Sequence, residues 1–180
     1  MIRLATMQDL DEINSIYQEI HSEEEAGRST IGWIRSIYPT RETAAEAIQA
    51  NELFVLTVNG QVIASARINQ EQVPEYADAQ WSFDAPPEQV MVMHTLVVSP
   101  SASGKGYGSR FIRFYEDYAR AHSCPFLRMD TNERNTAARR LYAGLGYREA
   151  GIVDCVFNGI PDVHLVCLEK TLSHPPIKAR

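Results

Sequence analysis

Three alternating glycines, Gly104, Gly106 and Gly108, form the stretch of this 180-residue chain that is best suited to chemistry. Glycine leaves no side-chain bulk and permits backbone angles that other residues avoid. An apolar run over 90–98 precedes the glycines and a periodic segment over 110–121 follows them, which predicts a strand, a turn and a helix. Backbone N–H groups in such a turn, at the positive end of a helix, bind anions such as phosphate or pyrophosphate.

Three interpretations of this turn compete. A P-loop requires Ser or Thr after its lysine, and Lys105 is followed by Gly106, so that interpretation fails. A dinucleotide-binding fingerprint is satisfied at Gly104 and Gly106 but has Ser109 at its third glycine position. A flexible turn without a ligand is the third interpretation. The elements around the glycines are therefore needed to distinguish these interpretations of the turn.

Length and composition exclude several classes of protein. A chain of 180 residues that is 44% hydrophobic is expected to form one globular unit with a core. The net charge of −6 argues against general nucleic-acid binding, and no apolar run approaches the roughly 20 residues of a membrane span. The N-terminus lacks a signal-peptide core, and the spacing of Cys124, Cys155 and Cys167 fits reduced thiols. We therefore expect a cytoplasmic protein without a metal site.

The patterns along the chain predict an alternation of strands and helices. Thr6 and Thr40 are expected to begin helices, and Asn59-Gly60 is typical of a hairpin turn. Gly146 is expected to end a helix over 135–145. The predicted strands cover 2–5, 53–58, 61–68, 90–98, 126–131, 148–157 and 163–170. This order predicts an α/β fold with a sheet of mixed direction and helices on both faces.

Two separated motifs carry a resemblance to a known family. The first is Leu96-Val97-Val98-Ser99-Pro100 followed by the glycine turn; the second runs from Asp130 to Asn135, then through Ala137-Ala138-Arg139-Arg140-Leu141-Tyr142 to Leu145-Gly146-Tyr147. Over 91–147 the chain resembles the GNAT superfamily of acetyl-CoA-dependent N-acetyltransferases. The resemblance implies one domain over 1–172 with a mixed, mostly antiparallel sheet of about six to seven strands and helices on both faces, followed by a loose tail over 173–180.

The resemblance also implies which residues hold acetyl-CoA. These are Leu96, Val97, Val98, Ser103, Gly104, Lys105, Gly106, Tyr107, Gly108, Ser109, Asn135, Ala138 and Tyr142. The strand around Leu96 to Val98 is expected to diverge from its neighbour and to offer an N–H group to the thioester carbonyl. Ser103 replaces the usual Gln or Arg, so we expect weaker or differently arranged binding. Asn135 also fits the N-cap of the following helix.

Catalytic and substrate residues follow from the same resemblance. Tyr142 matches the tyrosine that protonates the departing thiolate, although a purely structural aromatic residue fits the same helix face. Candidate bases are His94, Glu88 and Glu133, and His94 fits a hydrogen-bonded strand histidine at least as well. Substrate contacts are expected from Trp33, Tyr38 and Glu88, within a cleft built from 21–38 and 69–89. Glu23-Glu24-Glu25 fits either a solvated helix end or a rim of this cleft.

The resulting hypothesis is a direct transfer of an acetyl group from acetyl-CoA to the primary amine of a small molecule or peptide. A protein N-terminus or lysine is the alternative acceptor, and the acidic balance favours a cationic amine. A second hypothesis, from another class, is a non-catalytic acyl-CoA-binding regulatory domain. The resemblance leaves a homodimer open.

Overall fold

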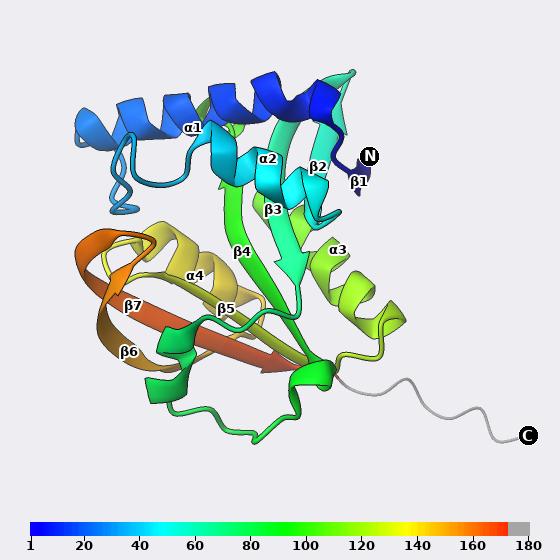
Figure 1. The fold of residues 1–180 in the computed structure, drawn as a ribbon, viewed down its shortest axis with the longest axis vertical. Helices are drawn as coiled ribbons and strands as arrows, with labels where there is room; N and C mark the ends of the chain where they lie inside the picture. Colours follow the sequence, from blue (N-terminus) through cyan, green and yellow to red (C-terminus); the bar gives the residue numbers. More distant parts are fainter. Residues whose placement is uncertain (173–180) are drawn as a thin grey trace, which may run out of the picture.

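The computed structural model describes residues 1–172, which form a seven-stranded sheet in the order β1-β2-β3-β4-β5-β7-β6 (Figure 1). All neighbouring strands are antiparallel except β4 and β5, which are parallel. The predicted mixed, mostly antiparallel sheet is thus confirmed. The strands are β1 (Ile2–Leu4), β2 (Leu53–Val58), β3 (Gln61–Asn69), β4 (Val90–Val98), β5 (Phe126–Asn132), β6 (Arg148–Phe157) and β7 (Ile160–Thr171).

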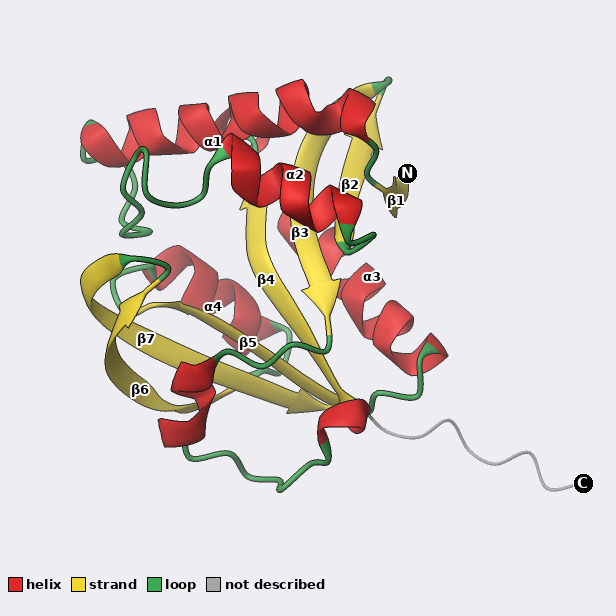
Figure 2. Ribbon diagram, in the orientation of Figure 1, coloured by secondary structure: helices red, strands yellow, loops and turns green. Residues whose placement is uncertain are grey.

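Helices cover both faces of the sheet, as predicted (Figure 2). Neighbouring residues of β2 show the two faces, because successive side chains of a strand point in opposite directions. Val55 packs in one cluster with residues of α1 and α2, whereas Phe54 packs against Phe114 of α3, with ring centroids 5.2 Å apart. The helices are α1 (Leu10–Glu25), α2 (Arg41–Gln49), α3 (Tyr107–Ala121) and α4 (Thr136–Gly144), with short 3-10 turns η1 (Met7–Asp9), η2 (Pro74–Asp78), η3 (Pro87–Gln89) and η4 (Pro100–Ala102).

Local sequence signals act as expected at the ends of these elements. Thr40 accepts a hydrogen bond from the backbone N–H of Thr43 at 3.3 Å and so caps α2. Asn59 and Gly60 have φ of 52° and 84°, the left-handed pair that a tight hairpin turn needs. Gly146, with φ of 84°, follows the end of α4.

The last hairpin differs from the expectation of a loop over 158–162. Asn158 and Gly159 alone make the turn, with φ of 51° and 77°, and β7 begins at Ile160, paired with Phe157. Pro161 then lies at a register shift between β6 and β7, where a strand tolerates a residue without an N–H group. The predicted loose tail over 173–180 lies outside the described residues.

The segment between β3 and β4 covers the sheet face over β5, β7 and β6. Tyr76 is buried there, and the Trp81 indole N–H donates to the backbone carbonyl of Tyr76 at 2.8 Å. The Arg128 guanidinium of β5 lies 4.2 Å from the centre of the Trp81 ring. Trp81 thus anchors this segment to the sheet, while Phe83 stays 46% exposed and contacts Phe126. This packing places Tyr76 beside β5.

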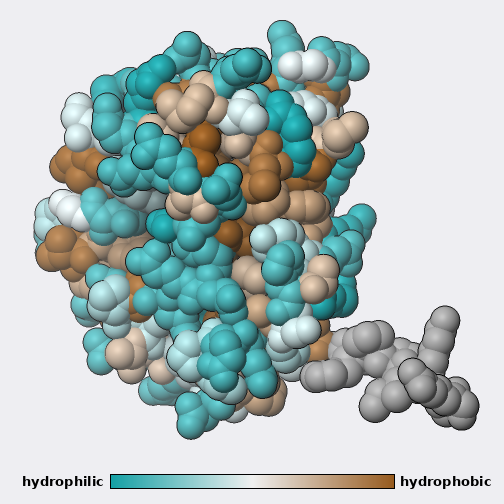
Figure 3. Space-filling model, turned by 45° about the vertical axis from the view of Figure 1, so that its right-hand side comes forward, coloured by the Kyte–Doolittle hydropathy of each residue, from teal (hydrophilic) through white to brown (hydrophobic). Residues whose placement is uncertain are grey.

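Among residues 1–172, no helix combines the length and the apolar character needed to cross a membrane. The face of the molecule drawn in Figure 3 carries mainly hydrophilic side chains, with hydrophobic groups between them.

Candidate active site

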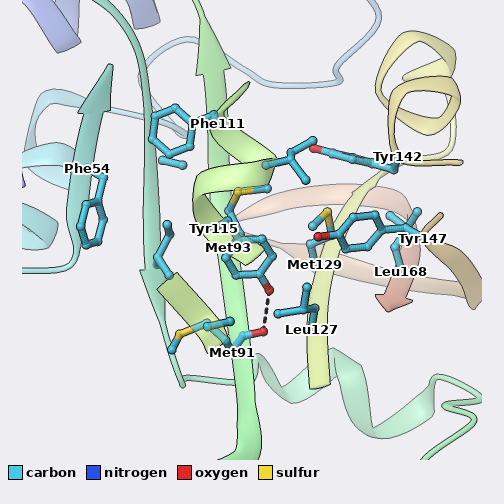
Figure 4. Packing of buried hydrophobic residues seen from close by; sticks show 14 of the residues in the cluster. Phe54, Met91, Met93, Phe111, Tyr115, Leu127, Met129, Tyr142, Tyr147 and Leu168 are labelled. Atoms are coloured by element: carbon cyan, nitrogen blue, oxygen red, sulfur yellow. Dashed lines mark hydrogen bonds between the residues drawn. The ribbon is translucent and has the colours of Figure 1, made fainter. Parts of the chain in front are cut away.

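The two parallel strands in the middle of the sheet separate along their length. β4 and β5 pair only from Val90 to Met93 and from Phe126 to Met129, and beyond these residues they diverge (Figure 1). Below the split, the Tyr115 hydroxyl of α3 donates to the Met91 carbonyl of β4 at 2.6 Å (Figure 4). The same hydroxyl lies 3.1 Å from the Arg128 carbonyl of β5. Tyr115 thus holds the two strands together where the gap begins.

A bulge in β4 faces this gap. Thr95 has φ of 53°, and the register between β3 and β4 shifts between Ser65 and Arg67. Past the bulge, the N–H of Ser99 donates to the Ile63 carbonyl at 2.8 Å. Because backbone groups alternate in direction along a strand, Leu96 and Val98 turn theirs toward the gap left by β5. The strand that was expected to diverge therefore offers backbone donors there.

A cavity of about 350 Å³ occupies the gap. Its polar floor comes from β3, β4 and β5 and includes Arg67, His94 and Asp130. Asn135, the N-cap of α4, and Tyr142 of α4 line one side, and the connection between α1 and α2 covers the cavity. The structure thus brings together predicted residues from three separate parts of the chain: Trp33, Tyr38, His94, Leu96, Asn135, Ala138 and Tyr142.

Asp130 is a functional candidate that the sequence analysis did not select. It follows Met129, the last residue of β5 that pairs with β4, and the Tyr76 hydroxyl donates to its carboxylate at 2.8 Å. Burial raises the pKa of Asp130 to about 6, against an ordinary value of 3.8. A carboxylate with this pKa is ionised at neutral pH and still accepts a proton readily. The available signal was an acidic residue in a predicted strand, directly after the mainly apolar segment Phe126-Leu127-Arg128-Met129.

Tyr142 lies where its hydroxyl can act on a group in the cavity. The side chain is 6% exposed, and the ring extends from α4 with its oxygen toward β4 (Figure 4). Burial first, and the charge of Asp130 second, raise the pKa of Tyr142, so the phenol stays protonated. Within residues 1–172 its hydroxyl has no hydrogen-bond partner, which leaves it available as a donor.

His94 reaches the cavity but is a weak base. Burial, and then the charge of Arg67, lower the pKa of His94 to about 4. Its Nε2 lies 2.9 Å from Oδ1 of Asn69, which fits the structural interpretation of a hydrogen-bonded strand histidine.

The structure does not bring the two predicted glutamates to the cavity. Glu88 is exposed in η3, before the first residue of β4, while the cavity lies toward the other end of that strand. Glu133 lies in the β5–α4 connection and does not line the cavity either. Glu88 therefore does not line the cavity as expected, because part of η3 and the first four residues of β4 separate it from His94.

The glycine turn forms an exposed approach to α3. Residues 103–106 are exposed, and Gly104 and Gly106 have φ of 74° and 78°, directly before Tyr107 begins the helix. Lys105 Nζ makes one long contact, 3.5 Å from the Ser101 carbonyl. Close packing against α4 explains the glycine at position 108, since an added Cβ would lie 3.2 Å from Cδ2 of Leu141. Of the remaining predicted cofactor residues, Tyr107 and Ser109 are half-buried, and the Val97 side chain is buried beneath α1 and α2, leaving only its backbone for a ligand.

Each glutamate of the run at the end of α1 shapes the connection to α2. Glu24 accepts hydrogen bonds from the backbone N–H groups of Ile31 and Gly32, both at 2.8 Å. Glu23 pairs with Arg28 at 2.8 Å and Glu25 pairs with Arg35 at 2.7 Å. This run therefore folds the segment that carries Trp33 and Tyr38 over the cavity.

The same connection is fixed to the far side of the gap. The Thr30 hydroxyl donates to the Arg134 carbonyl at 2.8 Å, and the Tyr38 hydroxyl forms a hydrogen bond with the Thr95 hydroxyl. In Figure 1 the connection descends from α1 toward the β6–β7 turn. The two lie close together, because a Cβ added to Gly159 of that turn would be 3.3 Å from Cγ2 of Ile37. The connection thus roofs the cavity.

A pair of glycine substitutions tests this roof. Gly32→Ala adds a Cβ that would lie 2.5 Å from Asn132 Nδ2, at a φ of 85°. Gly27→Ala is the matched control, since its φ is 68° and no atom lies within 4 Å of an added Cβ. Both variants are expected to lose about 1–2 kcal/mol of unfolding free energy through backbone strain. Only Gly32→Ala is expected to raise the KM for the acceptor as well; equal kinetic effects of the two would contradict the roof.

The comparisons with known proteins agree with this geometry. Residues 10–147 match the model of the acetyltransferase (GNAT) family. A putative acetyltransferase from Staphylococcus aureus Mu50 is 25% identical, with 96% of this chain and 99% of that chain covered and a TM-score of 0.71. A GNAT-family acetyltransferase from Streptococcus agalactiae is 22% identical, with coverage of 96% and 95% and a TM-score of 0.81.

A third solved structure, a putative acetyltransferase from Salmonella typhimurium with its cofactor acetyl-CoA, is 19% identical, with 99% of this chain and 97% of that chain covered and a TM-score of 0.70. No functionally curated protein gives a significant match. The fold is thus that of the GNAT acetyltransferases. The chain belongs to the GNAT family and is an acetyl-CoA-dependent N-acetyltransferase.

Proposed function

We propose that this protein transfers the acetyl group of acetyl-CoA directly to the primary amine of a small molecule or peptide, with the reaction in the gap between β4 and β5. One observation carries the proposal. The cavity in that gap holds a protonated phenol, Tyr142, and a carboxylate, Asp130, whose pKa of about 6 suits a general base.

The residues of the chain fit acetyl-CoA at two places. The N–H groups over 104–109, in the glycine turn and the first turn of the 15-residue helix α3, suit a pyrophosphate. The free backbone edge of Leu96 and Val98 suits the amides of pantetheine, which would pair with it as an added strand. Ser103 has no long side chain that could reach the pyrophosphate. Lys105, within the turn, is the positively charged residue that could contribute instead. Bound acetyl-CoA would supply the activated acetyl thioester.

Asp130 is proposed to remove the proton that an amine must lose before it attacks. An acceptor amine enters as an ammonium ion at neutral pH, and Asp130 accepts its proton directly or through a water molecule. Tyr76 keeps the carboxylate oriented through its 2.8 Å hydrogen bond. With a pKa of about 4, His94 attracts a proton about a hundredfold less than a group with a pKa near 6.

Tyr142 and the β4 backbone are proposed to stabilise the charges that develop during transfer. The N–H of Leu96 or Val98 donates to the carbonyl oxygen as it becomes negative. The Tyr142 hydroxyl then donates its proton to the sulfur as the C–S bond breaks, and the resulting phenolate takes up the second proton that the nitrogen loses as the amide forms. Asn135 accepts a hydrogen bond from the Ala138 N–H at 3.2 Å and caps α4, which fixes the helix that carries Tyr142. No covalent enzyme intermediate is required.

The proposal is tested by incubating the protein with acetyl-CoA and a panel of primary amines, and by measuring release of the CoA thiol. The panel contains small amines, short peptides with free N-termini and peptides with a lysine, which separates the alternative acceptors. Thiol release with a small amine or short peptide supports the proposal. Tight binding of acetyl-CoA without turnover of any amine would favour the non-catalytic acyl-CoA-binding alternative instead.

A further inference from the structure

The charges around the cavity narrow the class of acceptor. We infer that the acceptor is a small cationic amine that carries no carboxylate or phosphate group of its own. This inference rests on the proposed function and concerns the same cavity. It follows from the state of Arg67, from the carboxylates around it and from the roof.

Arg67 is the one lysine or arginine that lines the cavity within residues 1–172, and carboxylates already bind it. Its Nε donates to Glu52 at 2.7 Å and its Nη2 donates to Glu71 at 3.0 Å. Asn69 donates to the same Glu52 oxygen at 2.9 Å, which fixes Glu52 in place. An acceptor with an anionic group would have to compete with these two carboxylates for Arg67.

The other charged groups that line the cavity are acidic. They are Glu46, Glu71 and Asp130, set against the single cation of Arg67, because a His94 with a pKa of about 4 is neutral at pH 7. No side chain of the described residues pairs with the Glu46 carboxylate. A partly enclosed cavity with an excess of negative charge attracts an ammonium ion and disfavours an anion.

The roof limits the size of the acceptor and adds a further preference for a cation. Trp33 and Tyr38 both face the cavity, with ring centroids 6.1 Å apart in an edge-to-face arrangement. Aromatic faces attract ammonium groups. The volume of about 350 Å³ must also admit the acetyl end of the donor, which leaves room for a compact amine.

Matched pairs of acceptors test the inference. We compare 5-aminopentanoate with 5-aminopentanamide, in which the exchanged group is far from the reacting amine, and phosphoethanolamine with ethanolamine. The kcat/KM of each neutral-tailed member is expected to exceed that of its anionic partner by about tenfold or more, as like charges in a cleft repel. If the kcat/KM of an anionic member equals or exceeds that of its neutral-tailed partner, the inference is wrong, while the acetyltransferase proposal stays intact.

One substitution should change this preference. Glu71→Gln removes one of the two carboxylates on Arg67, so the ratio of kcat/KM between 5-aminopentanamide and 5-aminopentanoate is expected to fall about threefold or more. Glu88→Gln removes the same charge before β4, away from the cavity, and is expected to leave the ratio unchanged. If instead the wild type prefers 5-aminopentanoate and Arg67→Gln abolishes its turnover, Arg67 is a carboxylate-binding residue and the inference is wrong. If no amine of either set releases thiol, the proposed function fails and the inference falls with it.

Discussion

Replacing Tyr142 by phenylalanine is expected to lower kcat by about 10²–10⁴-fold, the usual contribution of a positioned proton donor. The ring would keep its place against Tyr147 and Ala138, so the affinity for acetyl-CoA should change little. Without the hydroxyl, the departing sulfur must leave as a thiolate that no protein group protonates. The measurement is the steady-state rate together with the dissociation constant of acetyl-CoA from calorimetry.

Tyr147→Phe is the matched control for this substitution. Tyr147 belongs to the same buried cluster, with its ring centroid 6.1 Å from that of Tyr142, but its hydroxyl is fully buried and it does not line the cavity. This variant is expected to retain the wild-type kcat. If both variants lose activity equally, or if neither does, the assignment of Tyr142 as general acid fails.

Replacing Asp130 by asparagine is expected to lower kcat/KM by about 10²–10⁴-fold, because the proton acceptor is lost while the shape is kept. In the wild type, kcat/KM should rise with pH through about 6 as the Asp130 carboxylate ionises. The variant should lack this rise. A pH profile with an unchanged rise near 6 in Asp130→Asn would assign the base elsewhere.

The same variant is expected to be more stable than the wild type at pH 8. Burial raises the pKa of Asp130 from 3.8 to about 6, so the folded state binds this proton more tightly than the unfolded state does. Ionisation of Asp130 therefore costs stability progressively as the pH rises from about 4 to 6, and the cost persists above that. Asparagine carries no charge and avoids this cost, which should raise the Tm at pH 8 but not at pH 3. A lower Tm at pH 8 would indicate a structural role for the Asp130 charge.

The order of strands and helices could be predicted because its signals are local. Apolar periodicity marks β4 and α3, and the pair Asn59-Gly60 marks the hairpin through the backbone angles it favours. Tyr142 and Asn135 were found because a short motif holds them at a fixed spacing, in one helix and at its N-cap. Such features need no knowledge of distant contacts.

The base and the charge state of the cavity could not be predicted, because both depend on contacts between distant residues. Asp130 owes its pKa to burial beside Tyr76, which is 54 positions away in the chain. Glu88 was one candidate because it is near His94 in sequence, yet part of η3 and the first residues of β4 separate the two. Pairing of Arg67 with Glu52 becomes evident only once β2 and β3 are aligned.

Amide hydrogen exchange with and without acetyl-CoA tests the central claim most directly, because it needs no knowledge of the acceptor. If acetyl-CoA binds in the gap between β4 and β5, the N–H groups of Leu96, Val98 and residues 104–109 will exchange more slowly in its presence. The core of β2, on the other side of β3, should show no comparable change. Binding of acetyl-CoA that leaves exchange at the gap and the glycine turn unchanged would contradict the account.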